Sequence, residues 1–416
     1  MMSTVPLKRA VRLITRRGTT KPDLPFIGLE HIKGWTGQIN FETDAEAEGT
    51  VGLFEAGDIL FGKLRPYLAK VALPRFRGTC STEALILRPN KGHDPRFLRY
   101  ALSTPEVIER INGTTFGAKM PRASWENIGR EKIPAPDFET QKAIADFLDR
   151  ETTRIDALVE KRHAFNELLD EVAKSLIADA INGGLIESQE RQDAAWLGTV
   201  PKTWDIRRMR FIYRERVGRS ETGEEELLSA SHLTGVTKRS EKEVNMFLAE
   251  SNVGYKKVMR NDLVVNTMWA WMGAMGISPE EGIISPSYGV YRPIDQRLSP
   301  EFADLVVRSP QFIAEATRRS KGIHSSRLRL YTDALYDIVF PVPPLDDQAH
   351  LVEQLARRRS RENALREKNE QAIALLQELR AAMITAAVTG QIDPDTYRRN
   401  GTTDRALDRI AEEMTQ

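Results

Sequence analysis

"IPAPDFETQ" occupies residues 133–141, and a near copy, "FPVPPLDDQ", occupies residues 340–348, 207 positions later. Each stretch holds an apolar residue, two or more prolines, an acidic segment and a final glutamine. Each also leads into 43 residues that contain neither Pro nor Gly, 139–181 and 346–388. Proline stiffens the exit from a strand, and acidic residues stabilise the first turn of a helix. The phrase therefore predicts a strand that ends at a long helix, made twice, with Asp137 or Asp346 at the helix start.

The acidic part of the first phrase has a second interpretation, as the metal-binding Asp…Glu-x-Lys core of a nuclease. Asp137, Glu139 and Lys142 have that order. A metal site needs carboxylates that converge at a fixed spacing, and the second phrase scrambles the acidic residues and has no lysine at the place of Lys142. The repeated phrase is therefore interpreted as a structural hinge.

The repeat extends over most of the chain. Residues 57–89, "GDILFGKLRPYLAKVALPRFRGTCSTEALILRP", align with residues 261–293, and "IGLEHIKGWTG" (27–37) aligns with "LSASHLTGVTK" (228–238). The offset between matched segments drifts only from 201 to 207, as small loop insertions would produce. A period of ~200 residues is far longer than the 20–50 residues of a solenoid repeat. The chain is therefore a tandem duplication of one domain followed by one helix.

The fold class expected is α+β, because short strand-like runs broken by Gly and Pro alternate with short helices in each copy. The predicted organisation has six parts. They are a first α+β domain (1–138), a long helix (139–184), a linker (185–195), a second α+β domain (196–345), a second long helix (346–390) and a charged tail (391–416).

Both long helices carry an apolar stripe that needs a partner, and the economical partner is the other helix. We expect an antiparallel coiled coil with the two domains near its opposite ends, related by an approximate two-fold axis. Gly183 and Gly390 are expected to cap the helix ends. The predicted seam residues are Leu148, Ile155, Leu158, Phe165, Leu169, Val172 and Leu176 in the first helix and Leu355, Leu365, Ala372, Leu376, Leu379 and Met383 in the second.

Composition and motifs argue against catalysis. The 416 residues carry a net charge of +1 and include six histidines and one cysteine. A single cysteine cannot form an intrachain disulfide, and its presence suits a reducing cytoplasm. No apolar run appears long enough for a membrane span, and the basic N-terminus lacks the apolar core of a signal peptide. The sequence also has no P-loop, no Gly-rich methyl-donor loop and no HExxH pair. We expect no catalytic residue, no metal and no cofactor in this chain.

Basic residues on Gly-flanked loops at matching places in both copies predict contacts with nucleic acid, since phosphates attract Lys and Arg. Trp269 and Trp271 are expected in the core, and His31 and His232 are expected to be structural. The predicted DNA-binding residues are Lys63, Arg65, Tyr67, Lys70, Lys119 and Arg122 in the first copy and Arg318, Lys321, His324, Ser325, Ser326, Arg327 and Arg329 in the second.

The sequence resembles the specificity subunits of type I restriction-modification enzymes. The resemblance rests on the two proline phrases, on the helix ends "INGGL" and "VTGQI", on "WLGTVPKTWDI" (196–206) and on the 57–89 block. It covers residues 5–395. It implies a non-catalytic subunit in which each domain reads one half of a bipartite site on double-stranded DNA. The helices would space the halves and dock two methyltransferase subunits.

The same resemblance implies partners that carry the chemistry. S-adenosylmethionine would bind the methyltransferase subunits, and ATP and magnesium would serve the translocase-nuclease subunits of a cytoplasmic defence system against phage. Two alternatives stay open. One is a duplicated coiled-coil adaptor that binds only proteins. The other is the detached recognition part of a fused restriction-methylation enzyme.

Overall fold

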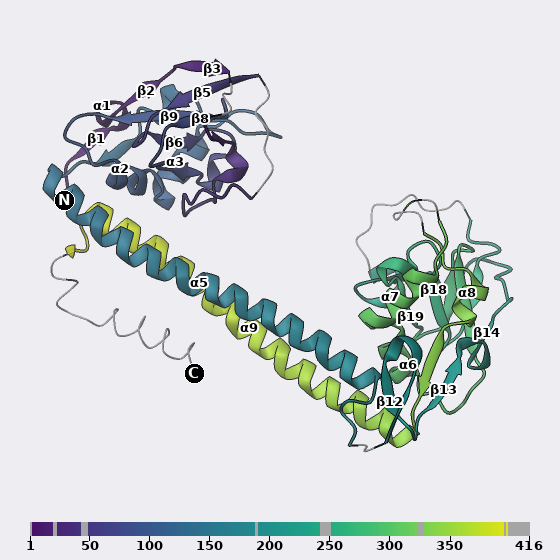
Figure 1. The fold of residues 1–416 in the computed structure, drawn as a ribbon. Coiled ribbons are helices and arrows are strands. Elements are labelled where there is room, and N and C mark those ends of the chain that lie inside the picture. The colour runs from purple at the N-terminus through teal and green to yellow at the C-terminus, as the bar shows by residue number, and fades with distance from the viewer. Residues whose placement is uncertain are drawn as a thin grey trace. The chain divides into compact units, whose positions relative to one another are not determined.

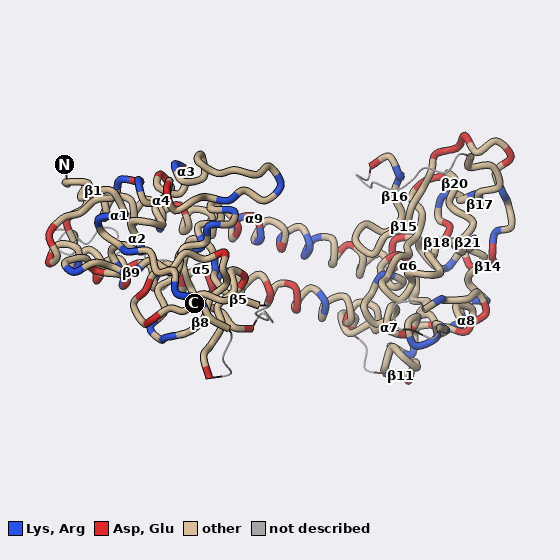
Figure 2. The backbone as a smooth tube through the Cα atoms, turned by 90° about the horizontal axis from the view of Figure 1, so that it is seen from above, with Lys and Arg blue, Asp and Glu red and all other residues tan. Residues whose placement is uncertain are grey.

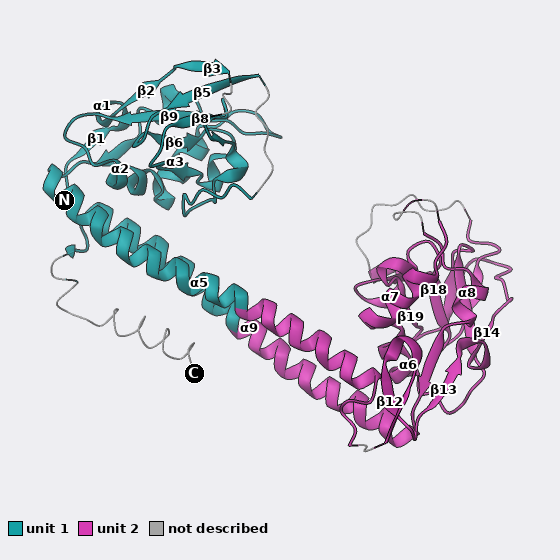
Figure 3. Ribbon diagram, viewed as in Figure 1, with its two compact units in different colours: residues 1–164, 369–416 teal, residues 165–368 magenta. Residues whose placement is uncertain are grey.

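A computed structural model describes residues 2–19, 23–42, 49–187, 190–241, 251–322, 324, 328–394 and 397. The chain forms two compact units, and both long helices contribute to each of them (Figure 3). Unit 1 comprises residues 1–164 and 369–416, whereas unit 2 is the continuous segment 165–368.

Unit 1 is a mixed α+β domain with one half of each long helix (Figure 1). Its strands are β1 (Thr4–Pro6), β2 (Val11–Ile14), β3 (Arg17–Thr19), β4 (Phe26–Ile27), β5 (Thr50–Phe54), β6 (Ile59–Gly62), β7 (Val71–Ala72), β8 (Gly78–Cys80), β9 (Ala84–Pro89) and β10 (Lys132–Pro134). Its helices are α1 (Leu7–Ala10), α2 (Pro95–Leu102), α3 (Pro105–Gly113), α4 (Trp125–Ile128) and the first part of α5 (Phe138–Ile181).

Unit 2 repeats this order of elements. Its strands are β11 (Arg191–Asp193), β12 (Thr199–Pro201), β13 (Asp205–Arg208), β14 (Tyr213–Glu215), β15 (Leu228–Ser231), β16 (Gly235–Lys238), β17 (Lys256–Val258), β18 (Leu263–Asn266), β19 (Met275–Ile277), β20 (Gly282–Ile284), β21 (Tyr288–Pro293) and β22 (Val339–Val342). Its helices are α6 (Pro300–Val307), α7 (Pro310–Arg319), α8 (Thr332–Tyr336) and the first part of α9 (Leu345–Thr389).

One four-stranded sheet and one strand pair match between the two units, whereas the sheet β3-β5-β8-β4 of unit 1 has no four-stranded counterpart in unit 2. The four-stranded antiparallel sheet β2-β9-β6-β7 of unit 1 has its counterpart in β14-β21-β18-β19 of unit 2. The pair β1–β10 corresponds to β13–β22, which joins the start of each domain to the strand before its long helix. The duplication inferred from the sequence is therefore present in the strand order.

A buried carboxylate recurs in the central strand region of both sheets. Asp58 binds Arg88 through both of its oxygens at 2.7 Å and accepts the backbone N–H of Glu55. Asp262, its counterpart, is fully buried and binds Arg216 in the same two-oxygen manner. The second copy therefore keeps the buried ion pair but takes its arginine from the segment after β14 rather than from β21.

The final glutamine of the proline phrase fastens each long helix to its own domain. Gln141 is 1% exposed; its Nε2 donates to the carbonyl of Pro136, and its Oε1 accepts from the backbone N–H of Asp94, which precedes α2. Gln348, fully buried, makes the equivalent bonds to Pro343 and Ser299 before α6. The phrase is thus a hinge held by one buried side chain.

The two helices begin differently. Asp137 precedes α5, and its side chain accepts both the N–H and the hydroxyl of Thr140, as expected of an N-terminal cap. Helix α9 begins at Leu345, one residue before the predicted Asp346, which lies inside its first turn. Gly183 and Gly390 follow the helix ends with φ of 72° and 78°, the left-handed conformation that favours glycine.

Within unit 1 the segments of α5 and α9 run antiparallel. Asp156 of α5 binds Arg380 of α9 at 2.8 Å, and six residues further along α5, Arg162 meets Asn369, eleven residues earlier in α9. The apolar contacts of this segment join the domain core. The buried residues that α5 and α9 contribute include Ile144, Leu148, Ile155, Leu158, Ile373, Leu376, Met383, Ile384, Ala387 and Val388. Within unit 2, Asp170 of α5 binds Arg366 of α9 at 2.7 Å.

Three of the predicted seam residues are exposed, and in each case an adjacent position is less exposed. Among the predicted seam residues, Leu148, Ile155, Leu158, Leu376 and Met383 are buried and Leu169, Leu176, Leu355, Ala372 and Leu379 are half-buried, whereas Phe165, Val172 and Leu365 are exposed. The less exposed positions next to the outlying ones are Asn166, Ala173 and Arg366. The helices therefore face each other there through polar or small residues, which an apolar pattern does not single out.

Helix α9 contains a segment that is long and apolar enough to cross a membrane, which we did not expect from the sequence. An 18-residue window of it has a mean hydropathy of 1.4, and 39% of that window is buried. In unit 1 the apolar residues of α9 belong to the domain core, beside the ion-paired Arg380. Length and hydropathy alone do not separate such a core helix from a membrane helix.

Candidate nucleic-acid interface

Two loops that lie far apart in the sequence of unit 1 are joined by backbone hydrogen bonds. The first follows β6 (residues 63–70) and the second follows α3 (residues 114–124). The N–H of Arg65 donates to the carbonyl of Pro121 at 2.7 Å, and the N–H of Ala123 donates to the carbonyl of Lys63 at 2.9 Å. The structure thus brings both predicted basic loops of the first copy into one surface, which we call loop pair 1.

The first loop of this pair turns sharply at two residues with positive φ, Arg65 at 49° and Ala69 at 46°. Non-glycine residues adopt this region at an energetic cost, so the surrounding contacts must hold them there. The second loop turns at Gly117, whose φ of 91° suits glycine alone.

The predicted residues of loop pair 1 fall into two groups. Arg65, Tyr67 and Lys119 are exposed, and Lys63 is half-buried. Lys70 and Arg122 are engaged within the domain instead. The Nζ of Lys70 donates to the carbonyl of Leu29 at 2.5 Å, and partial burial lowers the pKa of that ammonium.

Arg122 binds Glu83 through its Nε at 3.1 Å and through Nη2 at 3.4 Å. Its backbone also pairs with Phe116 across the second loop. Arg122 therefore holds loop pair 1 in shape, and its guanidinium charge is already partly neutralised.

Unit 2 joins two loops in the same way, the loop after β18 and the loop after α7, and we call them loop pair 2. The N–H of Leu330 donates to the carbonyl of Thr267 at 2.9 Å, which is the counterpart of the bond between Ala123 and Lys63. Lys321 and Arg329 pair across the loop after α7 as Phe116 and Arg122 do after α3. The same backbone arrangement thus presents different side chains in the two copies.

The predicted residues of loop pair 2 are largely exposed. Lys321, His324 and Arg329 are exposed, and Arg329 also donates to the hydroxyl of Thr267 at 3.3 Å. Arg318 binds Glu315 at 2.7 Å, and this hydrogen bond raises the pKa of its guanidinium. Ser325, Ser326 and Arg327 lie outside the described residues.

Exposed aromatic and thioether side chains accompany the basic residues, and of these the sequence interpretation named only Tyr67 as a DNA-binding residue. Phe116 is 63% exposed, Trp269 is 52% exposed, and Tyr67, Met120, Met268 and Tyr331 are each more than 40% exposed. Trp269 is therefore not a core residue, while Trp271 is half-buried and donates its indole N–H to the carbonyl of Met268 at 3.0 Å. Aromatic rings stack on bases, so this composition suits nucleic acid.

The two aligned histidines also differ. His31 is 4% exposed and accepts the N–H of Gly28 on its Nδ1 at 3.1 Å, a structural role, whereas His232 is exposed. Lys and Arg are interspersed with Asp and Glu over each unit rather than gathered in one region (Figure 2). No group of three or more His, Cys, Asp or Glu that could hold a metal occurs among the residues the structure describes.

Comparison with known proteins identifies this combination of domains and helices. Residues 12–164 match the model of the type I restriction modification DNA specificity domain. Within residues 12–164 the chain therefore has a type I restriction modification DNA specificity domain. It is similar to the EcoDI specificity subunit of Escherichia coli, with 22% identity over 39% of this chain and 37% of that protein. It is also similar to the EcoBI specificity subunit of the same organism, with 21% identity over 72% of this chain and 66% of that protein. The matched segments thus span less than two thirds of either relative.

Solved structures share the fold. The HsdS subunit from Thermoanaerobacter tengcongensis matches with a TM-score of 0.52 and 16% identity, over 94% of this chain and 97% of that one. A chain from a study of complex assembly and conformational transition of the type I R-M system matches with a TM-score of 0.63 and 18% identity, over 93% and 97%. At these identities the likeness concerns the fold.

Proposed function

We propose that this protein is the non-catalytic DNA-reading subunit of a type I restriction-modification complex. Unit 1 and unit 2 each read one half of a bipartite, asymmetric site on double-stranded DNA, and each does so with its loop pair. The domain match over residues 12–164 and the similarity to two type I specificity subunits support this proposal. The proposed place of action is the cytoplasm, where the DNA is.

The observation that carries the proposal is that one backbone arrangement recurs with different side chains. Loop pair 1 presents Arg65, Tyr67 and Lys119, while the same positions and their neighbours in loop pair 2 present Trp269, Lys321 and Arg329. Lys and Arg contact phosphates and guanine edges, and exposed apolar groups contact thymine methyls or stack on bases. A conserved frame with variable side chains suits two readers of two different half-sites.

The long helices are proposed to set the distance between the half-sites and to dock two methyltransferase subunits. Helices α5 and α9 have 44 and 45 residues, and each is part of both units. At a rise of 1.5 Å per residue, each helix is about 66 Å long. Adenine methylation with S-adenosylmethionine, and DNA cleavage with ATP and magnesium, are assigned to partner subunits.

Methylome sequencing tests this function directly. A host carrying the intact complex is compared with one lacking this gene, and loss of one bipartite adenine-methylation motif is expected. Hosts carrying Arg65→Ala with Lys119→Ala, or Trp269→Ala with Arg329→Ala, are then compared. The first pair should relax one half of the motif and the second pair the other half. Glu281→Gln, an exposed change outside both loop pairs, serves as the control.

An unchanged methylome in the deletion strain would contradict the function. A protein-only adaptor is the alternative, and it predicts that the loop variants leave every methylated motif intact. Relaxation of both halves by a single pair of substitutions would contradict the assignment of one half-site to each unit.

A further inference from the structure

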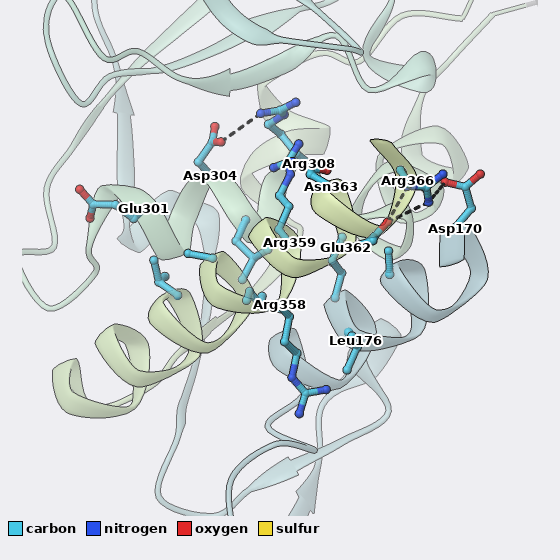
Figure 4. Close-up of a pocket in the computed structure, with 16 residues that line it drawn as sticks. Asp170, Leu176, Glu301, Asp304, Arg308, Arg358, Arg359, Glu362, Asn363 and Arg366 are labelled. Carbon is cyan, nitrogen blue, oxygen red and sulfur yellow. Dashed lines mark hydrogen bonds and ion pairs between the residues drawn. The ribbon is translucent and has the colours of Figure 1, made fainter. Parts of the chain in front are cut away.

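Unit 2 contains a hollow of about 550 Å³ between α6 and the paired segments of α5 and α9 (Figure 4). Apolar side chains from all three helices form part of its wall, and four arginines with four carboxylates line the rest. The volume lies within the range of small-molecule sites. The residues used below are Ala173, Asp304, Leu305, Arg308, Ala356, Arg359 and Asn363.

The equivalent place in unit 1 is filled by a network of polar contacts. The hydroxyl of Tyr100 donates to Asp149 at 2.8 Å and lies 2.9 Å from the hydroxyl of Thr152. Arg96 binds Asp146 at 2.6 Å and Asp149 at 3.0 Å. These contacts join α2 to α5.

Helix α9 completes the network in unit 1. Arg380 is 7% exposed, binds Asp156 of α5 at 2.8 Å and donates to the carbonyl of Trp35 at 3.0 Å. One long guanidinium side chain thus occupies the space between the two long helices and the domain.

The second copy replaces three members of this network with smaller residues. At equivalent positions of the repeat, unit 2 has Leu305 in place of Tyr100, Ala356 in place of Asp149, and Ala173 in place of Arg380. Asn363 stands for Asp156. A phenol, a carboxylate and a guanidinium are therefore absent at positions that line the hollow, which accounts for its volume.

Two arginines take positions that hold hydroxyl residues in unit 1. Arg308 replaces Ser103 and Arg359 replaces Thr152. Arg359 extends from α9 toward Arg308 (Figure 4). Nη1 of Arg308 donates to Oδ2 of Asp304 at 3.4 Å, and Nη2 donates to the carbonyl of Leu233. The Nε of Arg308 is buried and has no hydrogen-bond partner among the described residues. Arg359 makes no hydrogen bond or ion pair with any residue that the structure describes.

We propose that this hollow binds a small organic carboxylate. Two guanidinium groups that point toward each other repel unless a negative group lies between them. Asp304 neutralises Arg308, whereas Arg359 beside it has no ion-pair partner among the described residues, so one bound carboxylate would neutralise it. Its oxygens would accept from the guanidinium groups of Arg359 and Arg308, and its apolar body would contact Leu305 and the neighbouring apolar wall. Guanidinium–carboxylate hydrogen bonds are among the stronger polar contacts in proteins.

Calorimetric titration of the full-length protein tests the proposal with three probes. The probe 2-naphthoate carries both the charge and the apolar body, 2-naphthylmethanol carries only the body, and acetate carries only the charge. We expect 2-naphthoate to bind at least about 10-fold more tightly than either of the others, because each lacks one part of the recognition. Equal affinity for 2-naphthoate and 2-naphthylmethanol, or no binding of 2-naphthoate, would overturn the proposal.

Three variants locate the site. Arg359→Gln should weaken 2-naphthoate binding roughly 10-fold, whereas Arg357→Gln, on the same helix and ion-paired to Glu353 outside the hollow, should not. Leu305→Tyr combined with Ala356→Asp copies the contact of unit 1 and should abolish binding while the protein stays folded by circular dichroism. Unchanged affinity in Arg359→Gln, or in the filled double variant, would place the ligand elsewhere and refute the site. DNA methylation patterns are a separate readout, so failure here leaves the proposed DNA reading intact.

Discussion

Arg162 and Asn369 occupy the same position in the two repeats, 207 residues apart, and they hydrogen-bond to each other. The amide Nδ2 of Asn369 donates to the carbonyl of Arg162 at 2.8 Å, and Nη1 of Arg162 donates to Oδ1 of Asn369 at 3.2 Å. When two equivalent helices run antiparallel, residues at the same position of the repeat can lie next to each other at only one level along the pair. This polar pair therefore lies where α5 and α9 present equivalent residues to each other within unit 1.

Substitution of Asn369 tests the role of this pair. Asn369 is 2% exposed, so Asn369→Ala leaves buried polar groups of Arg162 without partners and should lower the free energy of unfolding by about 1–3 kcal/mol. Urea denaturation followed by circular dichroism measures the change. Glu370→Ala, at the exposed neighbouring position, should change it by less than about 0.5 kcal/mol. Equal effects of the two substitutions would argue against the pair.

The buried glutamines of the repeated phrase should be needed for domain stability. Gln141→Ala removes the partners of the Asp94 N–H and the Pro136 carbonyl, which costs about 2–4 kcal/mol of unfolding free energy. Lys142→Ala, exposed on the same turn, is the matched control. Gln141→Glu should be destabilising as well, because a carboxylate can still accept but cannot donate to the proline carbonyl. Native-like stability in Gln141→Ala would show that the domain does not depend on this fastening.

The ion pair between Asp156 and Arg380 should show strong coupling in a double-mutant cycle. Both side chains are largely buried, so removing either one leaves an uncompensated charge and should cost about 2–4 kcal/mol. The double variant Asp156→Ala with Arg380→Ala should cost less than the sum of the two single changes. Additive single effects, measured by urea denaturation, would mean that the pair contributes no interaction of its own.

Asp295 should make unit 2 sensitive to acid. Hydrogen bonds from Arg297, together with those from Arg207, lower the pKa of this carboxyl to about 2, against burial, which raises it. Because the folded-state pKa lies below the unfolded value, the stabilisation is present above about pH 4 and is lost as the pH falls toward 2. Asp295→Asn should therefore be less stable than the parent protein near neutral pH, and the difference should shrink in that acid range. A difference that stays constant down to pH 2, or an equal effect of Glu281→Gln, would contradict this.

The salt dependence of DNA binding should report the exposed cations of loop pair 1. If Arg65 and Lys119 each neutralise one phosphate, Arg65→Ala and Lys119→Ala should each reduce the slope of log affinity against log salt by about 0.9. Fluorescence anisotropy with the assembled complex and its own site measures this slope. Lys70→Ala should leave the slope unchanged, because that ammonium is bound to Leu29. A slope that Lys70→Ala alters as much as Arg65→Ala does would overturn the assignment.

The sequence predicts the duplicated architecture well because periodic and repeated features determine it. The two prolines and the glutamine of each phrase repeat with their structural neighbours, so the strand exit and the helix start follow from sequence alone. The contacts between the two long helices are predicted less well. Arg366 and Asn369 lie between the helices and Leu365 does not, because ion pairs and amide hydrogen bonds compensate polar groups there. A pattern of apolar residues does not reveal which polar residues pair with each other between the helices.

The candidate interface was predictable in position but not in detail. Basic residues between turn-forming glycines point to the loops, and the structure joins those loops through bonds such as Ala123 to Lys63. The sequence does not distinguish Lys119, which is exposed, from Lys70, which donates to a carbonyl inside the domain. An exposed aromatic residue such as Phe116 also resembles a core residue until its surroundings are known.

The division of the long helices has a consequence for the order in which the protein folds. The core of unit 1 is built from residues up to Val159 together with Ile373–Val388, and the whole of unit 2 lies between these segments in the chain. Unit 2 is continuous, so a growing chain can complete it while the second half of α9 is still unmade. The first domain to leave the ribosome is then the last to be finished, and until α9 arrives its exposed apolar surface is open to chaperones and proteases.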